Sequence, residues 1–266
     1  MELDGKVAVI TGGASGIGLA TARLLAERGC RLVLADIEEP ALQRTVQELG
    51  AGTQTVGIVT DVSDKASVDS LAERTDEQFG GADIVFLNAG VGTSGPVAET
   101  THADWQWVIG VDLWGPIHGV EAFLPRMVAA GRGHLLFTAS FAGLAPNVGL
   151  GPYCVAKYGV VALAEVLHKE LRDSGVAVSV LCPMLIDTNV GRSHRNRPTA
   201  LGGPGPESLN LTADPTLVGR VLAPEGVAER VVNAIGTDQL YIVTHSEMRP
   251  LVARRFGRID AAFDSL

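Results

Sequence analysis

Tyr153 and Lys157 are the residues of this sequence whose types and spacing most directly indicate chemistry. Four residues apart on a helix, their side chains would lie one above the other on the same face. A tyrosine phenol has a pKa of about 10 in water, and a neighbouring ammonium group stabilises the phenolate. Such a pair could exchange a proton with an alcohol or a carbonyl. A helix can also carry this spacing with the lysine only reaching solvent, so the surrounding sequence must decide.

A glycine-rich turn, Thr11–Gly18, lies near the amino end of the sequence. It follows an apolar run and opens a helical pattern, so the helix would present unpaired N–H groups and its positive dipole end to an anion. Gly12 would allow a tight turn, Gly16 a close approach to a pyrophosphate, and Gly18 close packing of helix on strand. The spacing differs from the usual dinucleotide fingerprint. The strand–turn–helix setting nevertheless predicts nucleotide binding through Gly12, Ser15, Gly16, Ile17 and Gly18.

Asp36 lies at the end of the next apolar run, 18 residues beyond Gly18. A carboxylate there can accept hydrogen bonds from both hydroxyls of an adenosine ribose and would repel a 2′-phosphate. Ile37 and the acidic residues after it offer that phosphate no nearby cation. We therefore expect NAD rather than NADP, with Asp36 and Ile37 among its contacts. Asp36 could instead only begin a turn or cap the following helix.

Two further loops would flank the adenine and ribose. Asp61-Val62 follows the third apolar run and Asn88-Ala89-Gly90 follows the fourth. We predict cofactor contacts from Asp61, Val62, Asn88, Ala89 and Gly90, although either segment could equally be ordinary turn chemistry.

The elements that must position these residues alternate along the chain. Nearly continuous apolar runs predict strands buried on both faces, and the segments between them have helical patterns. Alternating strands and helices predict βαβ crossovers and a parallel sheet. We therefore expect one α/β domain over residues 1–266, a Rossmann-type doubly wound parallel sheet of about seven strands with helices on both faces. The predicted strands are Lys6–Ile10, Arg31–Ala35, Thr55–Thr60, Ala82–Leu87, Gly133–Thr138, Val176–Leu181 and Gln239–Thr244, and the helices lie near 16–29, 38–49, 64–79, 104–130, 151–174, 225–236 and 246–263.

Residues 189–224 do not fit this alternation, because they contain five of the thirteen prolines. A long irregular segment in a compact domain is usually a functional lid or disordered. We favour a substrate lid, since the segment follows the sixth strand at the carboxyl edge of the sheet, where open α/β folds bind ligands. The residues near 246–266 would form a carboxyl-terminal extension.

Composition restricts the partners of the chain. The net charge of −9 and the pI of about 5.1 argue against nucleic acid. No apolar run approaches the ~18 residues that span a bilayer, and the acidic start is not a signal peptide. The odd number of widely spaced cysteines, three, argues against a disulfide framework and for a reducing cytoplasm. The histidines show no metal-binding spacing, so we expect no metal site.

Taken together, these motifs resemble the short-chain dehydrogenase/reductase family, in its single-domain branch. The resemblance covers residues 3–190 and includes Thr11–Gly18, Asn88-Ala89-Gly90, Ser140, Tyr153-x-x-x-Lys157 and Pro183 with Thr188, in the family's order. It implies that Tyr153 is the acid/base of a secondary alcohol oxidation with NAD as hydride acceptor. Lys157 would hold the nicotinamide ribose, and Ser140 would hydrogen-bond the substrate oxygen. The nicotinamide contacts would be Pro183, Ile186 and Thr188.

Asp112 departs from the family pattern, which has asparagine at this position. In the family, that asparagine helps to hold a water that links the lysine to solvent, largely through its backbone carbonyl. We expect Asp112 either to pair with Lys157 through water or to oppose ionisation of Tyr153 by like charge. Activity should then persist with a shifted pH dependence.

The substrate side is expected to be bulky and apolar, which favours an aromatic or alicyclic secondary alcohol. The residues that suggest this are Phe141, Leu144, Val148, Leu150, Met184 and Leu185. Three arginines in Arg192–Pro198 could meet an anionic group or, by default, be solvated surface charge. That run, Trp107–Gly119 and Leu240–Met248 are similar to a subgroup that oxidises benzylic α-carbon alcohols of lignin-type aryl ethers. The tryptophans of the long helix are expected in the core or at a subunit contact.

The family also implies a homodimer or homotetramer built on the helices near 104–130 and 151–174. Two other functions remain open. A nucleotide-sensing protein could keep the fold without chemistry, and an epimerase or dehydratase could hold NAD permanently. Retention of Ser140, Tyr153 and Lys157 disfavours the first, and the glycine spacing and modest length disfavour the second.

Overall fold

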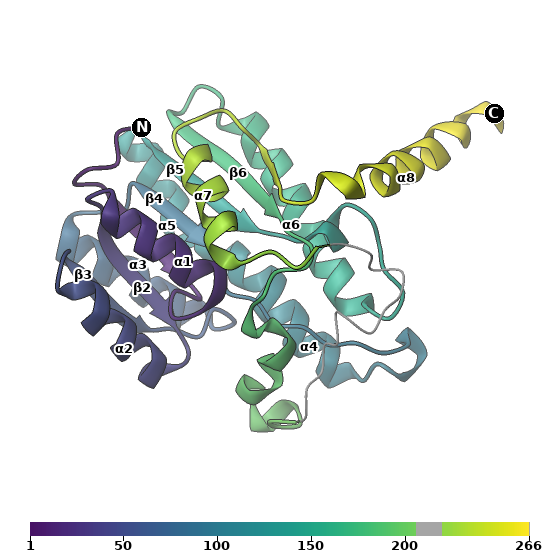
Figure 1. Cartoon of the computed structure of the whole chain (residues 1–266), viewed down its shortest axis with the longest axis horizontal. Helices are drawn as coiled ribbons and strands as arrows, with labels where there is room; N and C mark the ends of the chain where they lie inside the picture. The colour runs from purple at the N-terminus through teal and green to yellow at the C-terminus, as the bar shows by residue number, and fades with distance from the viewer. Residues whose placement is uncertain (206–219, 266) are drawn as a thin grey trace.

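Seven parallel strands form one sheet in the computed structural model, which describes residues 1–205 and 220–265 (Figure 1). The strand order is β3-β2-β1-β4-β5-β6-β7, so the chain reverses its direction of travel across the sheet between β1 and β4. Ligands bind outside the carboxyl ends of the strands at such a reversal. The predicted doubly wound fold is therefore confirmed. The strands are β1 Val7–Thr11, β2 Arg31–Asp36, β3 Thr55–Val59, β4 Ile84–Leu87, β5 Gly133–Thr138, β6 Val176–Cys182 and β7 Tyr241–Val243.

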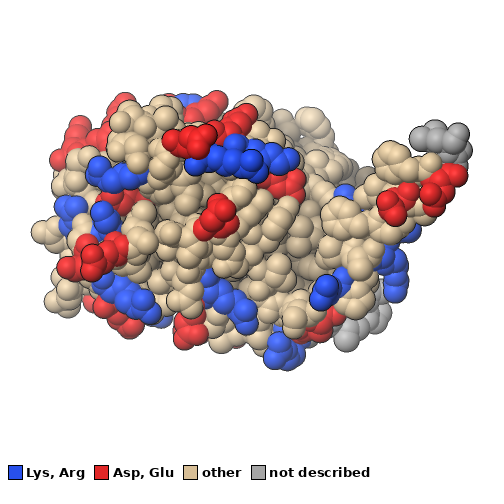
Figure 2. Space-filling view, turned by 90° about the horizontal axis from the view of Figure 1, so that it is seen from above, with Lys and Arg blue, Asp and Glu red and all other residues tan. Residues whose placement is uncertain are grey.

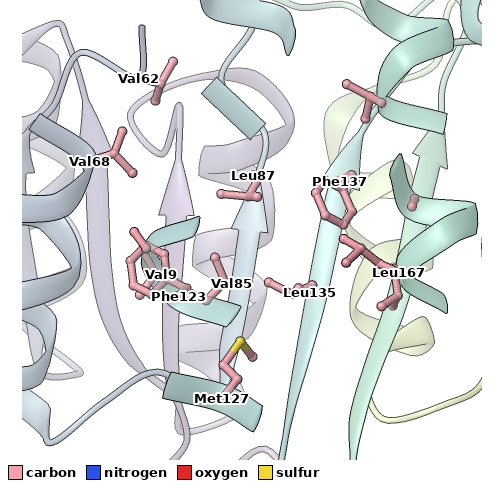
Figure 3. Close-up of a cluster of buried hydrophobic side chains, with 14 of the residues drawn as sticks. Val9, Val62, Val68, Val85, Leu87, Phe123, Met127, Leu135, Phe137 and Leu167 are labelled. Atoms are coloured by element: carbon pink, nitrogen blue, oxygen red, sulfur yellow. The ribbon is translucent and has the colours of Figure 1, made fainter. Parts of the chain in front are cut away.

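Helices cover both faces of this sheet, which is why its central strands are apolar on both sides. Along β1, Val7 and Val9 face one hydrophobic cluster, whereas Ala8 and Ile10 face the other. The first cluster contains residues of α3, α5 and α6 (Figure 3), and the second contains residues of α1 and α7. The helices are α1 Gly16–Glu27, α2 Glu39–Gly50, α3 Lys65–Phe79, α4 His102–Ile109, α5 Gly115–Ala130, α6 Gly151–Glu170, α7 Pro224–Ala234 and α8 Arg249–Ala261.

The helix predicted over 104–130 is not continuous. A π-helical turn, Gly110–Trp114, separates α4 from α5. Because a π turn inserts an extra residue into the helical ladder, it changes which side chains face the core, and such turns occur often at functional sites. Here it turns Asp112 into the protein, where its side chain is fully buried.

The predicted lid is helical in its first part. Asn189–Asn196 and Thr199–Leu201 form 3₁₀ turns. Ile186, just before this segment, pairs with Leu222, near its end, in an isolated parallel bridge. The predicted lid residues 206–219 lie outside the described residues, so a lid over the whole of 189–224 stays a prediction.

At the carboxyl end, α8 extends away from the body (Figures 1 and 2), and none of its described residues is buried. On the body in Figure 2, basic and acidic side chains are interspersed. No helix in residues 1–205 and 220–265 combines the length and apolar character needed to cross a bilayer. Within the same ranges, no cluster of three or more His, Cys, Asp or Glu residues is arranged to hold a metal ion. Cys30, Cys154 and Cys182 are buried free thiols.

Candidate active site

A cleft lies along the carboxyl ends of the strands, and residues from most parts of the chain meet there. Of the catalytic and cofactor-binding residues predicted from sequence, all but Gly18 line it. Its walls include Gly12, Ser15, Gly16, Ile17, Asp36, Ile37, Asp61, Val62, Asn88, Ala89, Gly90, Asp112, Ser140, Tyr153, Lys157, Pro183, Ile186 and Thr188.

Tyr153 and Lys157 share one face of α6, as their spacing predicts. The Lys157 Nζ lies 5.5 Å from the centre of the Tyr153 ring and donates a hydrogen bond to the carbonyl of Thr138 at 3.0 Å. Lys157 is only 2% exposed, so it does not reach solvent. The alternative in which this lysine is an ordinary surface residue is therefore wrong.

Ser140 lies between β5 and α6 and is buried. Its hydroxyl accepts a hydrogen bond from the Ala142 N–H at 3.1 Å, which caps the short 3₁₀ turn Phe141–Gly143. The same hydroxyl donates to the Pro183 carbonyl at 3.4 Å, a long contact. The cap fixes the oxygen in place, while the weakly engaged hydrogen can turn toward a ligand.

Asp112 contacts Lys157 directly rather than through a water. Its Oδ2 lies 3.2 Å from the lysine Nζ, and both side chains are almost fully buried. Its Oδ1 accepts a hydrogen bond from the Val91 N–H at 2.8 Å. The expected water-mediated pairing is thus replaced by a direct ion pair, because the π turn brings the carboxylate inward.

These groups change one another's proton affinity. Burial raises the pKa of Tyr153. The Lys157 charge and a hydrogen bond with the Ser140 hydroxyl oppose that rise, whereas the Asp112 charge adds to it. Burial lowers the pKa of Lys157, but Asp112 and Tyr153 outweigh burial, so that pKa is raised overall. Burial likewise raises the pKa of Asp112, although the positive charge of Lys157 opposes that rise. Lys157 is therefore held as a cation beside the phenol.

At the other end of the cleft, the glycine turn has the shape that a pyrophosphate requires. Gly12 and Gly16 have φ of +65° and +52°, which favours glycine. A Cβ on Gly18 would lie 2.1 Å from the Gly12 carbonyl oxygen, so Gly18 permits closure of the turn. Within the described chain, Ser15 forms no side-chain cap on α1 and the first turn of that helix has no acidic residue. These N–H groups therefore fit an anionic ligand.

Asp36 forms the turn that the sequence left open as one of its two roles, and it also lines the cleft. Its Oδ2 accepts a hydrogen bond from the Ala14 N–H and its Oδ1 from the Glu38 N–H, each at 3.0 Å. The carboxylate thus ties the glycine turn to the start of α2. A carboxylate has about four acceptor positions, so the same oxygens can still receive ribose hydroxyls from the cleft.

Asn88 is a structural link as well as a lining residue. Its side chain donates to the Thr11 carbonyl at 3.1 Å and accepts from the Thr138 hydroxyl at 2.9 Å. It links the carboxyl ends of β1, β4 and β5 and so fixes the positions of these three strand ends beneath the cleft.

The segment after β6 brings one of the three arginines of Arg192–Pro198 into the lining of the cleft. Arg195 forms an ion pair with Glu38, beside Asp36 and Ile37. The prediction of no cation near the ribose end was wrong, because it considered only chain neighbours of Asp36. Arg197 pairs with Asp104 at 2.6 Å. Both arginines are therefore paired with carboxylates, and Arg195 is still 38% exposed to solvent.

On the substrate side, Phe141, Leu150, Met184 and Leu185 line the cleft as predicted. Leu144 and Val148 are not among the lining residues, and Val148 is 93% exposed. Trp107, expected only in the core or at a subunit contact, is buried and also lines the cleft, where the Arg197 guanidinium lies 5.4 Å from its ring. The sequence pattern of the helix alone could not identify Trp107 as a residue of the cleft.

Comparisons with known proteins agree with this geometry. The model of the short chain dehydrogenase family matches residues 6–199. The chain is 34% identical over 263 residues to a C alpha-dehydrogenase of Sphingobium sp. (strain NBRC 103272 / SYK-6), covering 97% of this chain and 86% of that relative. It is also 34% identical over 263 residues to a 1-deoxy-11-beta-hydroxypentalenate dehydrogenase of Streptomyces avermitilis, covering 97% and 92%. A crystal structure of a short chain dehydrogenase/reductase from Burkholderia phymatum in complex with NAD is similar at TM-score 0.91 and 40% identity, covering 98% of this chain and 96% of that one.

Proposed function

This chain belongs to the short chain dehydrogenase family, and from that membership we propose that it is an NAD-dependent dehydrogenase interconverting a secondary alcohol and its ketone. The observation that carries the proposal is that Tyr153 lines the same cleft as the buried Lys157 and Ser140 and as the glycine turn at the start of α1. A base, a cation that stabilises it and a donor for the substrate oxygen are what this reaction needs.

In the oxidation, Tyr153 as phenolate takes the hydroxyl proton of the alcohol. Lys157 stabilises that phenolate by its charge, and Asp112 keeps Lys157 protonated despite its burial. Ser140 donates a hydrogen bond to the substrate oxygen and gives up its long contact to the Pro183 carbonyl. Bound NAD⁺ would supply the acceptor for the hydride that leaves the alcohol carbon. The products are the ketone and a protonated Tyr153, and the reverse reaction reduces the ketone.

The cofactor would lie along the whole cleft. The open amino end of α1 suits the pyrophosphate, and Asp36 suits the unphosphorylated adenosine ribose. The similar protein from Burkholderia phymatum is in complex with NAD. We expect the nicotinamide to lie between Tyr153 and the segment from Pro183 to Thr188.

The substrate we propose is a bulky aromatic or alicyclic secondary alcohol. Trp107, Phe141, Leu150, Met184 and Leu185 give the far side of the cleft an apolar wall. An apolar wall favours an apolar ring over a sugar or a carboxylate. The name of the relative from Sphingobium, a C alpha-dehydrogenase, and the resemblance to benzylic alcohol dehydrogenases both support this class.

We further propose that the enzyme works as a homodimer or homotetramer. Val155 and Val166 on α6 and Trp114 before α5 are each about half exposed, on the helices that the family resemblance implicates. Packing against a second copy would remove these side chains from water. A cytoplasmic location stays a prediction from the free cysteines.

The test is an assay of NAD⁺ reduction with a panel of aryl, alicyclic and sugar alcohols, in which the absorbance of reduced nicotinamide is recorded over time. We expect the fastest turnover with an aryl secondary alcohol and a loss of at least about a thousandfold in Tyr153→Phe, since the proton acceptor is gone.

Tyr158→Phe is the matched control, because Tyr158 lies on the same helix but is not among the cleft residues. It should retain full activity. Turnover of Tyr153→Phe at the wild-type rate would refute the mechanism. NAD that survives purification without turnover of any alcohol would instead favour an epimerase or dehydratase.

A further inference from the structure

Glu38 connects the two walls of the cleft at the end where Asp36 lies. Its Oε1 accepts a hydrogen bond from the Asn196 amide at 2.9 Å and a second from the Arg195 guanidinium. Glu38 belongs to the loop after β2, whereas its two partners follow β6, more than 150 residues further along the chain. All three residues line the cleft.

Both sides of this contact are fixed by other hydrogen bonds. The Glu38 N–H donates to the Asp36 Oδ1 at 3.0 Å, which holds Glu38 at the start of α2. On the opposite wall, the Gly92 N–H donates to the hydroxyl of the buried Ser193 at 3.1 Å. The Arg195 guanidinium also donates to the Arg192 carbonyl at 2.9 Å. The Arg195 side chain is therefore held at the edge of the cleft, close to Glu38 and Asp36.

Basic side chains are few in the lining of the cleft. Among the described residues that line the cleft, the only Lys or Arg side chains are Lys157 and Arg195. Lys157 is engaged by Asp112 in the interior. Arg195 is thus the cation available near Asp36, and a guanidinium is well suited to bind a phosphate with two parallel hydrogen bonds. Glu38 engages that guanidinium instead.

We propose that Glu38 determines cofactor choice through Arg195: the ion pair with Glu38 occupies the Arg195 guanidinium, which would otherwise bind the 2′-phosphate of NADP. The inference rests on the proposed function and adds a second basis for selecting NAD. Asp36 acts by direct repulsion, whereas Glu38 acts by engaging the residue that would otherwise attract the phosphate. Discrimination of this kind penalises the wrong ligand instead of improving the right one.

The test measures equilibrium binding of NADH and NADPH by nicotinamide fluorescence, without turnover, in wild type and three variants. In Glu38→Gln, which keeps the size of the side chain and an acceptor for Asn196, NADPH should bind about five- to tenfold more tightly. NADH affinity should change less than about twofold, because the ribose hydroxyls do not need the arginine.

Two further variants separate this effect from a general loss of negative charge. Glu39→Gln removes the same charge from the next residue, whose carboxylate accepts from Gln43, and should leave the NADPH to NADH ratio unchanged. The double variant Glu38→Gln/Arg195→Gln should lose the gain.

An unchanged ratio in Glu38→Gln, an equal gain in Glu39→Gln, or a gain that persists in the double variant would each overturn the proposal. A wild-type chain that binds NADH with no shift in these variants would leave the dehydrogenase proposal intact. A wild-type chain that binds neither nucleotide would overturn both.

Discussion

The cleft contains two ion pairs between a carboxylate and a cation that come from distant parts of the chain. In the inner pair, Lys157 and Asp112, the side chains are 3% and 0% exposed. In the outer pair, Arg195 and Glu38, they are 38% and 31% exposed. The same two types of charge therefore meet in very different surroundings.

This difference in solvent access decides what each pair can do. Two charges in the interior interact strongly, and removal of one leaves the other buried without compensation. The inner pair therefore sets the protonation of its neighbours, above all Tyr153. An exposed pair contributes less than about 1 kcal/mol and is screened by salt. The outer pair cannot hold the fold together, but it can decide which ligand charge is accepted at the rim.

The largest effect is expected from removal of the inner cation. Lys157→Met would leave Asp112 buried without its partner and Tyr153 without the charge that stabilises the phenolate. We expect alcohol oxidation to fall about a hundred- to ten-thousandfold, and the free energy of unfolding to fall by about 3–5 kcal/mol. Steady-state rates and urea unfolding measure the two effects.

Lys169→Met makes the same substitution at an exposed position of the same helix and is the control. It should change neither quantity. If Lys157→Met behaved in the same way as this control, the interior pair would have no role in catalysis.

A smaller effect is expected from neutralisation of the inner carboxylate in Asp112→Asn. Asp112 raises the pKa of Tyr153 by like charge, so its loss should lower that pKa. Oxidation needs the phenolate, which is present above the pKa and lost as the pH falls through it. The acid limb of the oxidation rate should therefore move to lower pH, as measured from rate against pH.

Asp69→Asn removes one negative charge from an exposed pair with Lys65 and should leave that limb in place. Profiles of wild type and Asp112→Asn that superimpose would discard the electrostatic role of Asp112. A shift to higher pH would mean that the substitution acts mainly by taking the proton from Lys157.

The smallest effect is expected at the outer pair. Arg195→Gln should lower the free energy of unfolding by less than about 1 kcal/mol, since its partner is accessible to water. The difference from wild type should vanish in about 1 M salt, where charges are screened within about 3 Å. Urea unfolding at low and high salt measures this. A loss from Lys157→Met should persist at both salt concentrations, and equal salt dependence of the two variants would contradict the comparison.

The sequence alone determined the features that depend on neighbours along the chain. Tyr153 and Lys157 share a face because a helix repeats every 3.6 residues. The glycine turn is fixed by local backbone freedom at Gly12 and Gly16. The parallel sheet follows from the alternation of apolar runs with helical patterns. The comparisons confirm the family that these features suggested.

Only the tertiary structure decided which charges meet. The sequence over 104–130 predicted one continuous helix, so the π turn that buries Asp112 against Lys157 became visible only in the tertiary structure. Nor could the sequence place Arg195 beside Glu38, since their positions depend on how the segment after β6 folds back over the cleft. Periodicity and turn chemistry act over a few residues, whereas electrostatic partners are chosen by distance in space and by exclusion of water. The proposed reacting groups were therefore readable from the sequence, and the ion pairs of the cleft were not.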